Sequence, residues 1–271
     1  MSTVPFQQVS SAAATQGGLV TAAQAGRAGL GRAELEALSS QGLLFELDWD
    51  VFQLTSSPLA PRFAYPFAAW LALAPDKFAS ERTAGDAVLS QGSAARLHGL
   101  GAVSAPTTTF LAPIQRFGRL PRAVEVTVDQ VAADEITVLG GVTVTTPHRT
   151  IVDLVRSHTD HGEVRGALTD AVLRDQIDLG RMYDDLLPLA AHHEFPDTGP
   201  EFVGYFLPEL QPAGLSPRNQ RALARVVLAD QVEETERALT AALARIPGGH
   251  RAEEQTVRAL AAEIVGRSER V

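Results

Sequence analysis

The chain has 271 residues, of which 45% are hydrophobic, and a formal net charge of −9. This composition is typical of a soluble globular protein with room for two or three domains, and the absence of cysteine excludes disulfides, thiolate metal sites and cysteine nucleophiles. No apolar run approaches the ~20 residues of a membrane helix, and no secretory signal pattern opens the chain. We therefore expect a cytoplasmic protein with no membrane partner, and its negative charge argues against broad coating of nucleic acid.

The first region, residues 1–57, predicts a winged helix-turn-helix domain. VSSAAATQ indicates one short helix, and Thr21 and Gln24 form a capping box that opens a second. A third helix is expected from Arg32 to about Gln41, because its leucines recur at core spacing. LLFEL and VFQL then read as two short strands joined by an Asp-Trp-Asp turn.

The second region, residues 58–157, predicts an α+β domain with a small mixed or antiparallel sheet. Its stretches YPFAAWLALA and GDAVLSQGSAARLHGL are typical of helices, and TTTFLAP, AVEVTVDQ, EITVL and VTVTT are β-rich. Thr146 and Pro147 supply the N-cap and first residue of another helix, in which Arg149 and Asp153 have the spacing of an i,i+4 ion pair.

The third region, residues 158–271, predicts a helical C-terminal extension. Ser216 and Pro217 are expected to begin one long amphipathic helix that ends at the Gly-Gly pair Gly248–Gly249. RAEEQTVRALAAEIV predicts a final helix. The apolar heptads of this region are interpreted as a packing stripe rather than a coiled coil. The expected fold class of the whole chain is α+β.

Several stretches resemble the AbiEi-type antitoxin family, the regulatory partners of nucleotidyltransferase toxins in type IV toxin–antitoxin operons of abortive infection. They are GGLVTAAQAGRAGLGRAELEALSSQGLL with VFQLTSSP, then LSQGSAARLHGL, VTVTTPHRTIVDLV and ALTDAVLRDQIDLGRM, and they span residues 17–187. The resemblance implies an antitoxin and transcriptional autoregulator that takes part in phage defence. Its N-terminal domain would bind inverted repeats in its own promoter DNA, and the next domain would counter a nucleotidyltransferase toxin.

If the first domain binds DNA, the start of its third helix enters the major groove. Arg32 is then the expected base or phosphate contact, and Arg27, Thr21 and Gln24 are expected to position the DNA backbone. The other reading of Arg32 is a solvated ion pair with Glu36, four residues further on.

The charge of this region favours a second hypothesis. Residues 17–54 carry two arginines against five carboxylates, a net charge of −3, whereas a DNA-binding module is normally positive on its docking face. The alternative function is a protein-interaction module with a degenerate winged helix, which binds a basic partner protein and does not read DNA. Trp49 at the hairpin tip is expected to cap the hairpin's own hydrophobic face or to meet a protein partner rather than to stack on a base.

A second contact surface is predicted around the loop IQRFGRLPR. Arg116, Arg119 and Arg122 lie there with a phenylalanine between them, and His148 is expected nearby in the fold. Such a loop binds nucleic acid or an acidic protein face, or is simply solvated.

No enzyme is predicted. The chain has no nucleotide-binding glycine motif and no Gly-x-Ser-x-Gly nucleophile motif. His158 with His161, and His192 with His193, are interpreted as surface histidines rather than metal ligands. We therefore expect no catalytic site, no metal and no cofactor.

Overall fold

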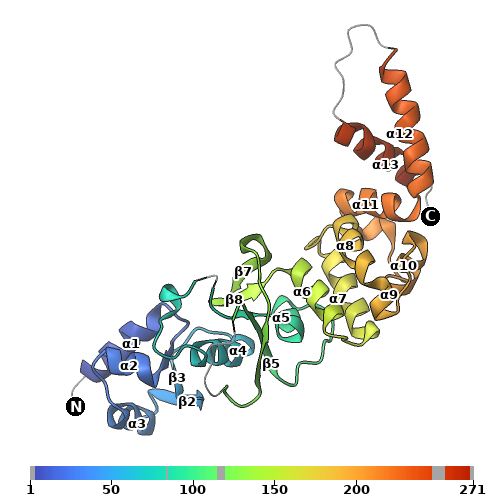
Figure 1. Cartoon of the computed structure of the whole chain (residues 1–271). Helices are drawn as coiled ribbons and strands as arrows, with labels where there is room; N and C mark the ends of the chain where they lie inside the picture. Colours follow the sequence, from blue (N-terminus) through green and yellow to red (C-terminus); the bar gives the residue numbers. More distant parts are fainter. Residues whose placement is uncertain (1–3, 84, 115–119, 246–253, 269–271) are drawn as a thin grey trace. The chain divides into compact units, whose positions relative to one another are not determined.

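The computed structural model describes residues 4–83, 85–114, 120–245 and 254–268. Its contacts divide the chain into two compact units: the first comprises Met1–Gly99 and Ser104–Thr150, and the second Leu100–Val103 and Ile151–Val271. Helices occur in both units, and the described strands form two small sheets (Figure 1). The predicted mixed α+β class is confirmed at this level.

The N-terminal part of the first unit packs helices against a three-stranded antiparallel sheet of order β1-β3-β2. Leu35 and Leu38 are buried with Val9 and Phe52 in its core, as the leucine spacing predicted. The elements are α1 (Val4–Ala14), β1 (Leu19–Thr21), α2 (Ala22–Arg27), α3 (Arg32–Ser40), β2 (Leu44–Asp48) and β3 (Val51–Leu54).

Two local features of this part follow directly from the sequence. The capping box is present: the Thr21 hydroxyl accepts from the Gln24 backbone N–H, and the Gln24 side chain accepts from the Thr21 N–H. Trp49 and Asp50 have φ of 55° and 58°, the left-handed backbone that a tight hairpin turn requires. Strand β1 was not predicted, because three residues are too few to show alternation.

The rest of the first unit is built on a five-stranded mixed sheet of order β6-β5-β4-β8-β7. Strands β4 and β8, and β5 and β6, pair in parallel, and the remaining pairs are antiparallel. Its elements are α4 (Pro61–Ala72), η1 (Ala79–Glu81), β4 (Val88–Leu89), α5 (Gln91–His98), β5 (Thr108–Ala112), β6 (Val124–Val128), η2 (Ala133–Glu135), β7 (Ile136–Leu139) and β8 (Val142–Thr145).

One sequence prediction in this part was wrong. GDAVLSQGSAARLHGL was expected to be helical throughout, but Val88 and Leu89 form the central strand of the sheet and α5 begins only at Gln91. Both residues are buried among side chains from distant segments, including Phe110 and Val144. Pairing partners that lie far away in sequence override the local pattern of so short a strand.

The second unit is helical. After α6 (Pro147–Arg156), which crosses the boundary between the units, it contains α7 (His161–Leu173), α8 (Leu179–Leu186), η3 (Leu187–Leu189), α9 (Ala190–His193), α10 (Gly199–Phe206), η4 (Pro212–Gly214), α11 (Pro217–Val227), α12 (Ala229–Leu243) and α13 (Glu254–Ser268). No helix in the described ranges is both long and apolar enough to cross a membrane.

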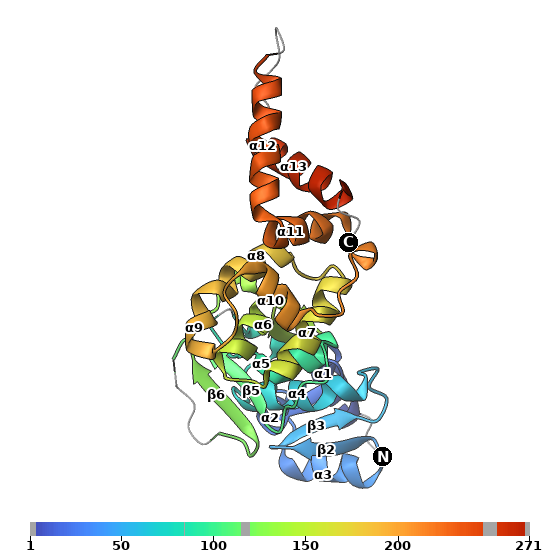
Figure 2. The same ribbon diagram turned by 90° about the vertical axis from the view of Figure 1, so that its right-hand side faces the viewer.

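The single long helix predicted after Ser216 was also wrong. The backbone breaks at Leu228, whose φ of −119° and ψ of 38° are not helical, so that α11 and α12 are separate helices. Helix α13 packs against both (Figure 2). Ala224 of α11 and Val232 of α12 share a buried cluster with α13.

Candidate functional site

The predicted DNA contact Arg32 lies in the first turn of α3 and is surrounded by carboxylates. Its Nε is 3.3 Å from Glu36 Oε1, its Nη2 is 3.7 Å from Glu46 Oε2, and its Nη1 is hydrogen-bonded to Asp50. We call these four residues the Arg32 cluster; its net charge is −2. The hydrogen bonds to Asp50 and Glu36 raise the pKa of Arg32. The predicted ion pair with Glu36 is therefore confirmed, and the hairpin adds two further carboxylates.

The Arg32 cluster is electrostatically unfavourable for a phosphate. A phosphate docked at about 4 Å from the guanidinium would gain about 1 kcal/mol in water, whereas each carboxylate about 6 Å away would repel it by about 0.7 kcal/mol. Three such repulsions together exceed the single attraction. The side chain of Arg32 is 52% exposed, so a partner molecule can reach the cluster. Its charge suits a cationic partner.

Arg27 is held by a different segment of the first unit. Its two terminal nitrogens are each 2.7 Å from an oxygen of Glu81, a two-pronged ion pair, and its guanidinium stacks over the Phe78 ring. It also donates to the backbone oxygen of Asp76. The hydrogen bond from Arg27, together with the backbone N–H of Phe78, lowers the pKa of Glu81 to about 2. The carboxylate that pairs with Arg27 is thus ionised at neutral pH.

Thr21 and Gln24 are buried instead of facing a DNA backbone. They are 1% and 0% exposed. The Thr21 hydroxyl donates to the backbone oxygen of Pro75, and the Gln24 amide nitrogen donates to that of Lys77 at 2.7 Å. The Gln24 amide oxygen also accepts from Gln16 Nε2 at 2.6 Å. Both side chains therefore attach the N-terminal helices to the segment after α4.

The predicted second surface is only partly within the described residues. Arg116 and Arg119 lie outside them. Arg122 is exposed shortly before β6, and His148 is half-buried in the first turn of α6. The second contact surface therefore stays a prediction.

Trp49 has a clear place in the fold. It is half-buried, packs on the hydrophobic cluster that includes Leu19 and Phe67, and meets the Tyr65 ring edge-on with 6.1 Å between centroids. Trp49 therefore covers apolar surface, but this surface includes β1 and α4 and is not the hairpin's own face alone, as had been expected. On β2, by contrast, Phe45 remains 44% exposed.

In the folded chain, His158 lies beside His192 and His193, although these residues are far apart in the sequence. The rings of His158, His192 and His193 lie 4.5 to 5.5 Å apart between centroids, and His161 Nδ1 is 2.8 Å from the Tyr205 hydroxyl. Burial, and then the neighbouring histidines, lower the pKa of His193. Within the described ranges, no three His, Asp or Glu side chains are arranged to hold a metal ion.

Comparison with known proteins adds no further constraint on this site. Neither a protein-family model nor a curated protein matches the sequence.

Proposed function

We propose that this chain is a non-enzymatic, cytoplasmic regulator of the antitoxin type, which binds a basic partner protein through a winged helix. The order of α1, β1, α2, α3, β2 and β3, with an antiparallel β1-β3-β2 sheet, supports a winged helix over residues 1–57. The resemblance of residues 17–187 to AbiEi-type antitoxins suggests a nucleotidyltransferase-type toxin as the partner.

The observation that carries the proposal is the Arg32 cluster. In a DNA-reading winged helix, α3 would present its cations to the duplex. Here the one arginine of α3 pairs with Glu36, Glu46 and Asp50. The exposed carboxylates of this cluster offer a negatively charged surface to a basic protein.

The contacts of the other predicted DNA ligands within the unit support the same conclusion. Thr21 and Gln24 would have to leave backbone acceptors inside the unit to touch DNA, and Arg27 would have to leave Glu81. Each of these changes would remove interactions that hold the unit together. Promoter binding to inverted repeats is the rival function, and a separate experiment tests it.

The test begins with the neighbouring gene, which the proposal predicts to encode a nucleotidyltransferase-type toxin. Binding of the purified toxin is measured by calorimetry at two salt concentrations. A triple variant, Glu36→Gln, Glu46→Gln and Asp50→Asn, should weaken binding by about tenfold or more, because it removes the charges that attract a basic surface. The matched control removes three exposed charges from α12: Asp230→Asn, Glu233→Gln and Glu234→Gln.

The rival function is tested by gel shift on the DNA upstream of the gene. The proposal expects no site-specific complex at low or moderate salt. Specific binding that Arg32→Ala abolishes, with a steep salt dependence, would refute the proposal and support a DNA-binding autoregulator. A triple variant that binds the toxin as tightly as the α12 control would also refute it.

A further inference from the structure

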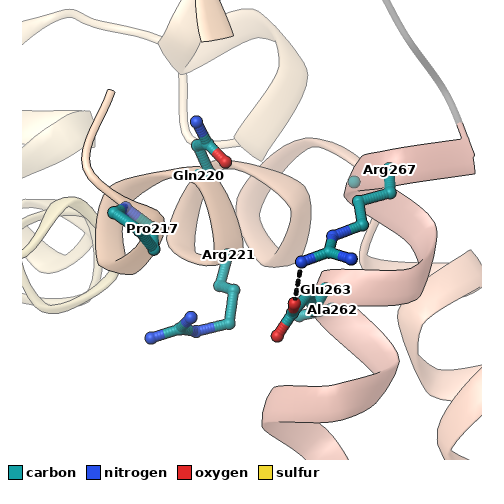
Figure 3. Close-up of a pocket in the computed structure, with 7 residues that line it drawn as sticks. Pro217, Gln220, Arg221, Ala262, Glu263 and Arg267 are labelled. Atoms are coloured by element: carbon teal, nitrogen blue, oxygen red, sulfur yellow. Dashed lines mark hydrogen bonds and ion pairs between the residues drawn. The ribbon is translucent and has the colours of Figure 1, made fainter. Parts of the chain in front are cut away.

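An open cavity of about 110 Å³ lies between α11 and α13, within the second unit. It occupies the start of α11 and the end of α13, where the two helices run close together (Figure 3). Its lining consists of three residues of α11 and four of α13: Pro217, Gln220, Arg221, Ala262, Glu263, Gly266 and Arg267.

Small residues set the spacing of the two helices. Ala224 and Ala262 are buried, and a Cβ on Gly266 would lie 3.4 Å from the Ala224 Cβ, an ordinary contact distance. The helices are therefore in close contact beside the cavity. All seven lining residues belong to the two helices and none to a loop.

The two arginines of the cavity differ in their partners. Arg267 Nη2 is 2.5 Å from Oε1 of Glu263, one helical turn earlier, which orients its guanidinium. Arg221 is half-buried, and within the described ranges no carboxylate pairs with it. The Gln220 amide donates to the backbone oxygens of Pro212 and Leu215, so it points away from Arg221 (Figure 3).

The lining therefore has a net charge of +1, in a chain whose net charge is −9. The planar guanidinium fork matches the geometry of oxyanions, and hydrogen bonds between the two are charge-assisted. Since one water occupies about 30 Å³ of liquid, the cavity has room for a phosphate-sized group. The two arginines come from different helices, Arg221 from α11 and Arg267 from α13, and the Arg221 guanidinium is turned away from the ion pair of Arg267 with Glu263 (Figure 3).

We propose that this cavity binds a phosphate group between Arg221 and Arg267. The group is either inorganic phosphate or the terminal phosphate of a small monoester, since both present the same oxyanion. Glu263 positions Arg267 but also repels the anion. This site lies in the second unit and does not depend on the winged-helix proposal.

The experiment titrates the full chain with inorganic phosphate and, separately, with glycerol phosphate, at an ionic strength held constant with sodium chloride. Calorimetry should show saturable binding, and bound ligand should raise the thermal midpoint. Arg221→Gln and Arg267→Gln should each weaken binding by about tenfold. Glu263→Gln should tighten it, because one negative charge leaves the cavity and Arg267 is freed to face the ligand.

Arg237→Gln, on the exposed surface of α12, is the matched control and should leave binding unchanged. Tighter binding of inorganic phosphate identifies the free ion as the ligand, and tighter binding of glycerol phosphate identifies a monoester; both support the site. Absence of saturable binding of either anion would overturn the proposal. So would full binding by Arg221→Gln, weaker binding by Glu263→Gln, or an equal loss in the control, provided circular dichroism shows each variant folded.

Discussion

Replacing Gln24 by alanine separates a structural role from a DNA-contacting one. The side chain is fully buried and makes three hydrogen bonds, with the Thr21 N–H at 3.0 Å, Gln16 Nε2 at 2.6 Å and the Lys77 oxygen at 2.7 Å. Gln16 keeps a second acceptor, the backbone oxygen of Leu19, but the Thr21 N–H loses the side chain that caps it. A buried donor left without a partner costs about 1–3 kcal/mol, and a lost hydrogen bond about 1 kcal/mol more. We therefore expect Gln24→Ala to destabilise the first unit by about 2–4 kcal/mol.

Urea unfolding followed by tryptophan fluorescence measures this effect. The chain has two tryptophans, Trp49 and Trp70, and both belong to the first unit, so the signal reports on that unit. The midpoint should fall with little change in the slope. Gln41→Ala is the control, because Gln41 is exposed at the end of α3 and its replacement should stay within about 0.5 kcal/mol. Equal midpoints for Gln24→Ala and the wild type would refute the buried-network reasoning.

Of two further predictions, one concerns His98 in the first unit and the other compares Gly199 with Gly204 in the second unit. His98 donates from Nε2 to the Thr145 oxygen at 2.7 Å, and burial lowers its pKa from the usual 6.5, so the unfolded chain binds the proton more readily. The free energy of unfolding of the first unit should therefore be highest above about pH 6.5 and should decline below it. His98→Gln should flatten this part of the pH profile of the urea midpoint measured by fluorescence. An unchanged slope in the variant would contradict the assignment of this pH dependence to His98. In α10, a Cβ on Gly199 would collide with the backbone oxygen of Val226, whereas one on Gly204 meets no atom within 4 Å. Thermal scans by circular dichroism should show that Gly199→Ala is destabilised by about 3 kcal/mol and that Gly204→Ala is stabilised by about 0.5–1 kcal/mol. Similar thermal midpoints for the two variants would rule out the predicted collision.

Local patterns were sufficient for much of the secondary structure. The capping box of Thr21 and Gln24, the leucine spacing of α3 and the alternation in β6 each depend on residues within one or two turns of each other. Two helix predictions were wrong: the helix expected over residues 85–100 and the single helix expected after Ser216. In both, contacts with segments distant in sequence decide where the element begins or ends. Strand β4 forms because β5 and β8 pair with it, and α11 ends at Val227, before the break at Leu228, beyond which α12 and α13 pack together.

By itself, the sequence determined the helices and the β-hairpin of the N-terminal part, the mixed α+β class and the acidic balance of residues 17–54. Only the tertiary structure decided what the candidate residues do. Thr21, Gln24 and Arg27 contact a segment about fifty positions away, from Pro75 to Glu81, and Arg32 meets the hairpin. The physical reason is that the composition gives only the number of charged residues, whereas their ion pairs depend on which side chains the fold brings within hydrogen-bonding distance.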